Sequence, residues 1–132
     1  MHRLNSVARG VAIVLALVVA DCGKPSNDPS RAGSRRVVQG GDARQGSILI
    51  AQFGCGGCHA IPGISNARGV VGPPLGNIAD RLIIAGMLAN TPENMTAWLE
   101  APQSIVPGNA MPNMGLKPAE ARNVAAYLYT LR

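Results

Sequence analysis

Apolar residues along the chain form one uninterrupted run and several stretches with helical spacing. The run, Val11–Ala20, has ten apolar residues and no polar face, and it is shorter than the about 20 residues that a bilayer-spanning helix needs. Later stretches at 42–54, 75–82 and 118–131 place apolar residues three or four positions apart, as on one face of a helix. No strand pattern of any length competes with them. The pattern therefore predicts an all-α fold of short helices.

Start and stop signals define these helices further. In 42–54 the shared face holds Ala43, Gly46, Ile50 and Phe53. A third helix is expected from Thr91-Pro92-Glu93, which supplies a cap, a proline at the first position and an acid in the first turn. It carries Trp98 and must stop before Pro102. The last helix starts at Pro118, and its apolar stripe consists of Ala121, Val124, Ala125, Leu128 and Leu131.

The N-terminus has the pattern of an export segment. A short basic start precedes the apolar run, as in a signal peptide. Val19-Ala20-Asp21-Cys22 resembles the lipobox of bacterial lipoproteins, in which the cysteine is acylated. Cleavage after Ala20 and an uncleaved anchor are the alternatives. We therefore divide the chain into an export or anchor segment (1–22), a flexible basic linker (23–41) and a folded domain (42–132).

Composition and charge narrow the class of protein. With 132 residues, 47% hydrophobic and 14% charged, the chain is long enough for one domain and too apolar to be disordered. Residues 23–41 hold four basic residues and one acid, so their net charge is 4 − 1 = +3, whereas from Asp42 onward it is 6 − 5 = +1. The folded part is nearly neutral and has no basic stripe, which argues against nucleic acid as a partner.

The strongest motif is Cys55-Gly56-Gly57-Cys58-His59. The spacing brings two thiols to one side of a turn, where each can bond a porphyrin vinyl group, and the next residue, His59, can reach the iron. A thioredoxin-like pair needs no histidine here, and a zinc site needs four ligands. Aromatic residues make up only 3% of the chain, and one covalent haem c supplies the large apolar filler that the core lacks.

From 41 to 132 the chain resembles class I cytochromes c, with motifs in the family's order. Gly46 stands nine residues before the first cysteine, and Tyr127 matches the aromatic where the first and last helices cross. Gly72-Pro73-Pro74-Leu75 resembles the family's Gly-Pro-x-Leu. The resemblance implies that the Pro73 carbonyl receives the His59 N–H, that Leu75 supports the pocket, and that Arg81 is a partner of a haem propionate.

The sixth iron ligand is expected among the methionines. Met111 lies in PGNAMP, a loop too rich in proline and glycine to be helical, and it follows Pro107 by four residues, as the family's axial methionine follows its proline. Met114 is the alternative. Met87 and Met95 are interpreted as core residues of helical stretches. Trp98 is interpreted as a core residue whose indole N–H is a further candidate for a propionate.

This ligand set predicts an electron carrier rather than an enzyme. With His59 and Met111 both on iron, no position remains for oxygen, peroxide or a small-molecule substrate. The stretches NTPENM, Trp98-Leu99 and PGNAMPNMGL resemble the cytochrome domain of subunit II in caa-type cytochrome oxidases. That resemblance implies a donor to a terminal oxidase, or a relay between a dehydrogenase and an oxidase. Together with the export segment, it predicts a carrier tethered at the periplasmic side of a bacterial inner membrane.

Three other functions stay open. The chain is alternatively the electron-accepting subunit of a periplasmic dehydrogenase, a peroxidase or gas sensor with a displaced Met111, or a metal-binding module without haem.

Residues 60–64 and 109–113, expected at the haem edge, contain no charge. We therefore expect docking to the redox partner to be apolar and nearly independent of salt.

Overall fold

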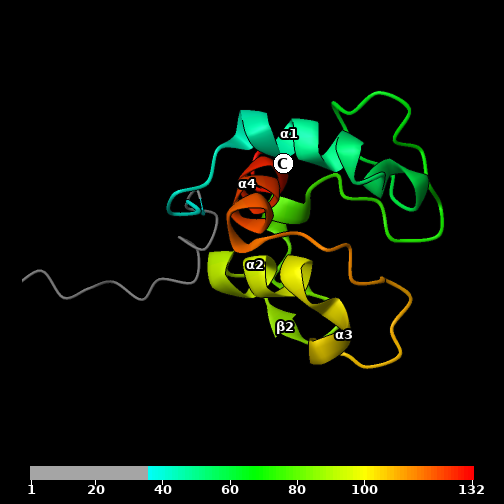
Figure 1. Ribbon diagram of the computed structural model, residues 1–132, viewed down its shortest axis with the longest axis vertical. Helices are drawn as coiled ribbons and strands as arrows, with labels where there is room; N and C mark the ends of the chain where they lie inside the picture. Colours follow the sequence, from blue (N-terminus) through cyan, green and yellow to red (C-terminus); the bar gives the residue numbers. More distant parts are fainter. Residues whose placement is uncertain (1–35) are drawn as a thin grey trace, which may run out of the picture.

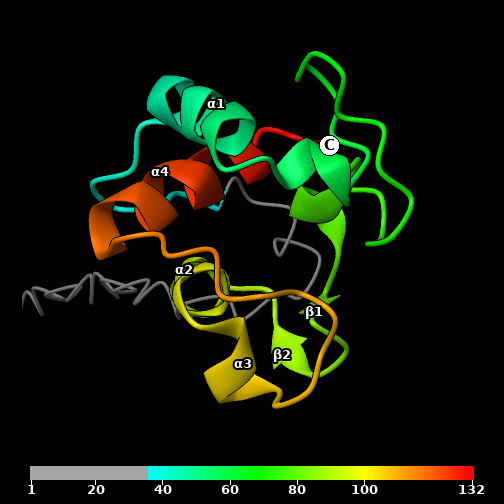
Figure 2. The ribbon, with the colours of Figure 1, turned by 45° about the vertical axis from the view of Figure 1, so that its right-hand side comes forward.

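The computed structural model describes residues 36–132 as a mostly helical domain with one small hairpin (Figure 1). Helices α1 and α4 cross at one end, and α2, α3 and the hairpin lie at the other (Figure 2). The predicted signal segment and Cys22 lie outside the described residues. Across 36–132, no helix is long and apolar enough to cross a bilayer. The elements are α1 (Ala43–Gln52), η2 (Cys55–Gly57), η3 (Ile78–Asp80), β1 (Ile83–Ile84), β2 (Leu88–Ala89), α2 (Pro92–Glu100), α3 (Pro102–Ile105) and α4 (Pro118–Leu128).

The crossing of α1 and α4 depends on one glycine. The carboxylate of Asp42 caps α1 by accepting hydrogen bonds from the amides of Arg44 and Gln45, at 2.8 and 3.2 Å. One turn later, a Cβ on Gly46 would overlap the backbone carbonyl of Asn123 in α4 and lie 3.0 Å from the Cβ of Tyr127. The two helices approach this closely because no side chain stands between them. The structure thus places Gly46 and Tyr127 at the predicted crossing.

The start signals predicted at Thr91 and Pro118 are confirmed, because α2 begins at Pro92 with Thr91 as its N-cap and α4 begins at Pro118. The Thr91 hydroxyl accepts a hydrogen bond from the Asn94 amide at 3.2 Å, and α2 ends at Glu100, before Pro102. At α4, the Glu120 carboxylate accepts from the Lys117 amide at 2.8 Å. The predicted stripe of α4 is buried at four positions, Ala121, Val124, Ala125 and Leu128. Its fifth member, Leu131, lies beyond the end of the helix and is half-buried.

The prediction of a helix over 75–82 is wrong. Asn77 adopts a left-handed conformation with φ of 58°, and only a single 3-10 turn, η3, follows it. The chain then forms the two-stranded antiparallel hairpin β1–β2, in which Ile83 pairs with Ala89 and Ile84 with Leu88. Met87 therefore lies on an exposed hairpin rather than in a helix. Pro102 also begins a helix that was not predicted, the four-residue α3.

The packed part of the chain begins earlier than the boundary predicted at Asp42. Val38 is 7% exposed and belongs to the core. The Arg36 guanidinium donates to the Ala79 carbonyl and lies 5.9 Å from the centre of the Tyr129 ring. The last six residues of the predicted linker, 36–41, are therefore part of the folded unit.

Candidate functional site

The two cysteines of the CxxCH motif are presented by a tight turn at the end of α1. Gly54 leaves the helix with a positive φ of 68°, which favours glycine. The amides of Cys58 and His59 then both donate to the Cys55 carbonyl, at 3.2 and 3.0 Å. Cys55 is half-buried and Cys58 is exposed, and burial raises the pKa of the Cys55 thiol. Both thiols line the same cavity, as attachment to one ligand requires.

The following loop holds the His59 imidazole. Its Nδ1 lies 2.7 Å from the Pro73 carbonyl oxygen, a distance at which the protonated nitrogen donates to that oxygen. The Gly72 amide donates to the Cys58 carbonyl at 2.8 Å, and a Cβ on Gly72 would overlap the imidazole ring. This contact fixes the ring and leaves Nε2 as the nitrogen available to a metal. The arrangement is the one that the family resemblance predicted for Pro73.

Met111 lies on a loop that two amide side chains hold in place. Gln103 Nε2 donates to the carbonyls of Asn109 and Met111, at 2.9 and 2.7 Å, and its Oε1 accepts from the Gly108 amide at 3.1 Å. Asn109 Oδ1 accepts from the Met111 amide at 2.7 Å. Neither Gln103 nor Asn109 was predicted to hold this loop. The only local signal was an asparagine two residues before the methionine, a common turn feature.

All four predicted haem-binding side chains, Cys55, Cys58, His59 and Met111, line one cavity of about 550 Å³. It lies between α1, α2, α4 and the hairpin. The cavity is also lined by apolar residues from these elements, among them Ile50, Ile84, Met95, Leu99, Val124 and Leu128. Volume and lining are those of a cofactor pocket in which a few polar groups set the orientation.

The remaining predicted pocket residues also line this cavity, in differing roles. Leu75 and Trp98 are half-buried against the core. Arg81 is the one Asp, Glu, Lys or Arg among the described lining residues. Its guanidinium donates to the carbonyls of Pro74, at 2.5 Å, and Gly76, at 3.3 Å. Arg81 thus braces the loop that holds His59. Its contact with a propionate, and that of Trp98, stay predictions.

Met95 and Met114 line the cavity together with Met111. Met95 is buried within α2, as predicted, whereas Met114 is half-buried on the loop that carries Met111. The structure therefore leaves Met114 close enough to the site to need an experimental test.

The donor set and the cavity fit a covalently attached haem. Two thiols stand at the cavity wall, an oriented imidazole and a thioether face its interior, and most of the lining is apolar. No other grouping competes within 36–132, where no three His, Cys, Asp or Glu side chains converge to hold a metal ion.

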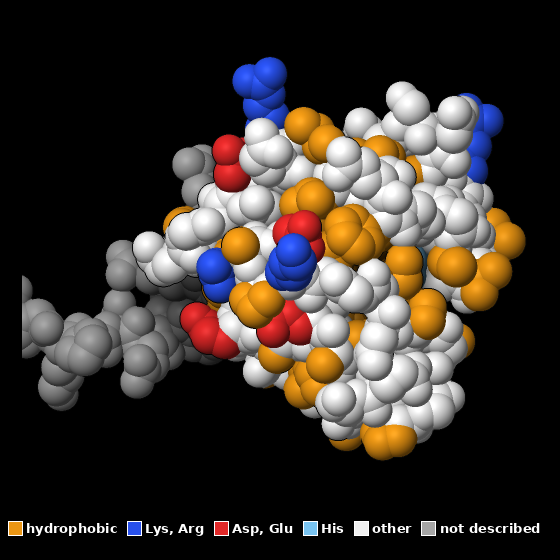
Figure 3. Space-filling model, in the orientation of Figure 1, with side chains coloured by type: hydrophobic (Ala, Val, Ile, Leu, Met, Phe, Trp, Pro, Cys, Tyr) orange, Lys and Arg blue, Asp and Glu red, His pale blue; other side chains and the backbone are white. Residues whose placement is uncertain are grey.

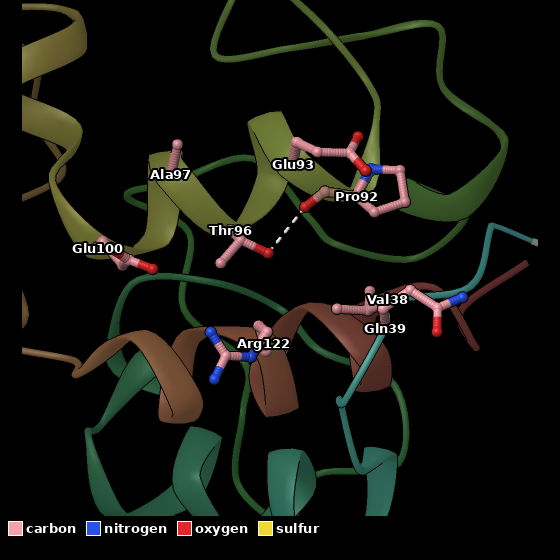
Figure 4. Close-up of a pocket in the computed structure, with 8 residues that line it drawn as sticks. All are labelled: Val38, Gln39, Pro92, Glu93, Thr96, Ala97, Glu100 and Arg122. Carbon is pink, nitrogen blue, oxygen red and sulfur yellow. Dashed lines mark hydrogen bonds between the residues drawn. The ribbon is translucent and has the colours of Figure 1, made fainter.

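A second, smaller cavity of about 350 Å³ lies between α2 and α4, beside residues 38–39 (Figure 4). It is lined in part by Glu93, Glu100 and Arg122, and the Thr96 hydroxyl donates to the Pro92 carbonyl within α2. None of the predicted site residues lines it.

Comparison with known proteins agrees with this geometry. A family model for cytochrome c matches residues 43–132. Cytochrome c oxidase subunit 2 of Alkalihalophilus pseudofirmus is 40% identical over 93 residues, which cover 68% of this chain and 26% of that protein. The subunit of the same name from Bacillus subtilis is 35% identical over 89 residues, covering 66% of this chain and 25% of that protein.

Cytochrome c2 of Agrobacterium tumefaciens is 34% identical over 104 residues, covering 67% of this chain and 90% of that protein. The chain thus matches about a quarter of the length of the oxidase subunits and most of the length of a single-domain cytochrome. The predicted resemblance to class I cytochromes c and to the cytochrome domain of oxidase subunit 2 is confirmed. The chain belongs to the cytochrome c family, with the class I fold, and is a c-type electron carrier.

Proposed function

We propose that this chain is a mono-haem cytochrome c that passes single electrons to a terminal cytochrome oxidase while tethered to the membrane by its N-terminus. The observation that carries the proposal is that His59 and Met111 line the same cavity as the two cysteines. His59 and Met111 would both bind the haem iron, which would leave no position on the iron for a substrate. We therefore propose electron transfer as its role rather than catalysis.

Each group has a distinct role in this proposal. The Cys55 and Cys58 sulfurs hold the haem covalently, which keeps the carrier loaded at any dilution. The Pro73 carbonyl accepts from His59 Nδ1 and raises the basicity of the imidazole. The bound haem supplies one-electron exchange at its iron. A thioether ligand favours the reduced metal and so raises the reduction potential.

The oxidase as partner is supported by the relatives named cytochrome c oxidase subunit 2. In those proteins the matching segment is about a quarter of one chain, so the cytochrome and the rest of the subunit are covalently joined. We propose that a membrane tether likewise keeps this carrier near its partner, because tethering raises its local concentration there. The apolar run at 11–20 and Cys22 are the sequence features that support the tether and the periplasmic location.

The ligand assignment is tested on the oxidised holoprotein. Sulfur ligation to iron(III) gives a weak charge-transfer band in the far red. We expect Met111→Ala to abolish this band and Met114→Ala to leave it, although both methionines line the cavity. Loss of the band in Met114→Ala with its retention in Met111→Ala would overturn the assignment.

The partner is tested with membranes that contain a terminal oxidase. The reduced holoprotein should support oxygen consumption that depends on its concentration, and Met111→Ala should not. If such membranes leave the protein reduced while those containing a periplasmic dehydrogenase reduce its oxidised form, the oxidase proposal is wrong and the dehydrogenase alternative replaces it.

A further inference from the structure

The hairpin carries exposed apolar side chains that the cavity does not account for. From Leu82 to Ala89 the chain reads LIIAGMLA, eight residues without a polar side chain. Leu82 is 70% exposed and Met87 is 62% exposed. Neither residue lines the cavity, so a group that fills the cavity leaves both in contact with solvent. Large apolar side chains clustered at a surface mark a contact with another apolar phase.

The hairpin is a well-defined element at the end of the domain that also holds α3. Ala85 and Gly86 at its tip have φ of 52° and 74°. The Met87 amide donates to the Ile84 carbonyl at 3.1 Å, so a tight turn closes the three-residue loop between Ile84 and Leu88. Figure 2 shows the hairpin on the side of the domain remote from α1. At its base, Asn90 is buried, and its side chain donates to the carbonyls of Ile78 and Arg81, both at 2.8 Å. Because hydrogen bonds hold its base and its tip is apolar, the hairpin can enter an apolar environment without unfolding.

The N-terminal segment joins the domain at the base of this hairpin. Arg36 donates to the Ala79 carbonyl, three residues before Leu82, and packs over the Tyr129 ring. The Tyr129 hydroxyl in turn donates to Asn90 Oδ1 at 2.8 Å, and Asn90 directly follows β2. Arg36, the first described residue, therefore lies beside the base of the hairpin.

The charges of the preceding linker indicate which membrane surface this side would meet. Residues 23–41 carry Lys24, Arg31, Arg35 and Arg36 against one acid, Asp28. The cytochrome role does not account for this excess. Basic residues close to a bilayer are attracted to anionic headgroups within about a Debye length. At most 16 peptide units separate Ala20 from Arg36, a span of about 55 Å when fully extended, so the linker keeps the domain near the surface.

We propose that the hairpin Leu82–Ala89 inserts Leu82 and Met87 into the surface of an anionic phospholipid bilayer, and that the basic linker holds the domain against the headgroups. This proposal rests on the membrane tether of the proposed function. A weak apolar contact combined with a basic segment is a known way to obtain a stable interfacial orientation. Because Ile83, Ile84, Ala85 and Gly86 also line the cavity, the contact would fix the orientation of the site relative to the membrane.

The test uses the full-length holoprotein, reduced and labelled with ¹³C-methyl methionine, in lipid nanodiscs that contain phosphatidylglycerol and phosphatidylcholine. Nitroxide-labelled lipid broadens the methyl signals of residues that contact the bilayer. We expect the Met87 signal to lose at least half its intensity, whereas that of Met95, buried in α2, keeps its intensity. An unchanged Met87 signal overturns the proposal. Equal broadening in discs of phosphatidylcholine alone overturns the role assigned to anionic lipid.

Two variants make the test specific to the hairpin. Leu82→Asp should restore the Met87 signal, while Val70→Asp, at a still more exposed apolar residue outside the hairpin, should leave it broadened. If the Met87 signal is not broadened by nitroxide-labelled lipid but broadens when the oxidase is added, the proposal is overturned in favour of a protein partner. The ring-current shift of Met111 reports the haem ligation, and co-elution with the discs reports the tether. Failure of the proposed function is therefore seen separately in the same samples.

Discussion

At the scale of single residues, the His59 imidazole is held by one loop that leaves no room for a side chain. The Pro73 carbonyl fixes one ring nitrogen, and the backbone of Gly72 packs against the ring itself. A methyl group at position 72 would displace either the imidazole or the loop, and both movements weaken the bond between histidine and iron.

We therefore expect Gly72→Ala to lower the yield of holoprotein with six-coordinate iron by at least about fivefold, since misplacement of a buried group by overpacking costs about 1–3 kcal/mol. The measurement is the haem content and the visible spectrum of protein matured in a competent host. Gly76→Ala is the matched control, because its Cβ would meet only the Pro62 ring at 3.6 Å. Equal yields of the two variants would contradict the prediction.

Tyr129 gives the domain a stability that depends on pH. Burial, the largest cause, raises the pKa of this phenol from 10.0 to about 12, while Arg36 opposes the shift and Glu93 adds to it. Between pH 10 and 12 the unfolded chain loses the phenolic proton and the native chain keeps it. The free energy of unfolding is therefore unaffected by this group below pH 10 and falls as the pH rises through that window.

The size of the fall is up to about 2–3 kcal/mol, because one unit of pKa corresponds to about 1.4 kcal/mol. Denaturant unfolding of the reduced holoprotein at a series of pH values measures it. We expect Tyr129→Phe to be less stable at neutral pH, since Asn90 Oδ1 loses its donor, but to show a smaller fall above pH 10. A fall as large as that of the natural protein would exclude Tyr129 as its source.

Several residues of the site were predictable because their signal is local. The CxxCH motif is contiguous, and its geometry follows from one turn. The roles of Gln103 and Asn90 were not predicted, because their amides hold carbonyls that are brought near by the fold rather than by spacing. An amide side chain has the same sequence signature whether it braces a loop or faces solvent, so sequence alone does not distinguish the two.

At the scale of elements, the loop that carries Met111 has no regular structure and is stabilised by side chains. Three hydrogen bonds join Gln103 to Gly108, Asn109 and Met111. Each bond contributes about 1 kcal/mol, so their loss would destabilise the position of Met111 by about 1–3 kcal/mol. If replacement of Met111 by another ligand is coupled to the loss of one proton, its midpoint would fall by about one to two pH units.

Gln103→Ala should therefore lose the far-red band of the oxidised protein at a pH lower by at least about one unit. Spectroscopic titration toward alkaline pH gives this midpoint. Ser104→Ala, at the exposed next residue of α3, should keep the midpoint of the natural protein. If both variants titrate alike, the amide of Gln103 does not hold the ligand loop.

Helices with capping signals were predictable and the hairpin was not. Thr91 and Pro118 are local start signals, and the structure has a helix at each of them. The hairpin lacks polar alternation, because Ile84 is buried while Ile83 and Met87 are exposed apolar residues. Its turn is formed by Ala85, which has no sequence preference for a positive φ. An apolar run that faces both the cavity and the surface resembles a helix face, and this is why Met87 was assigned to a helical stretch.

At the scale of the whole molecule, charged side chains are scarce around the cavity, where Arg81 is the one Asp, Glu, Lys or Arg among the described lining residues. Between Glu100 and Lys117 the chain carries no charge, and the stretch from Gly69 to Ala79 carries none either. On the face seen in Figure 3, the region over α3 and the loop that follows it shows neither basic nor acidic side chains. Val71, which is 72% exposed, lines the cavity at this uncharged border.

A carrier with this surface gains little from electrostatic steering, so its encounter rate should respond weakly to ionic strength. We expect the second-order rate of oxidation by oxidase-containing membranes, measured by stopped flow, to change less than about threefold between low and physiological salt. Val71→Asp would place an unpaired carboxylate in an apolar contact, which is costly, and should lower the rate at least about fivefold at every ionic strength. Ile48→Asp, on the exposed face of α1, should leave the rate unchanged. A tenfold or greater fall with salt in the natural protein would instead mean that charges outside the cavity border guide the partner, and the apolar docking surface would have to be abandoned.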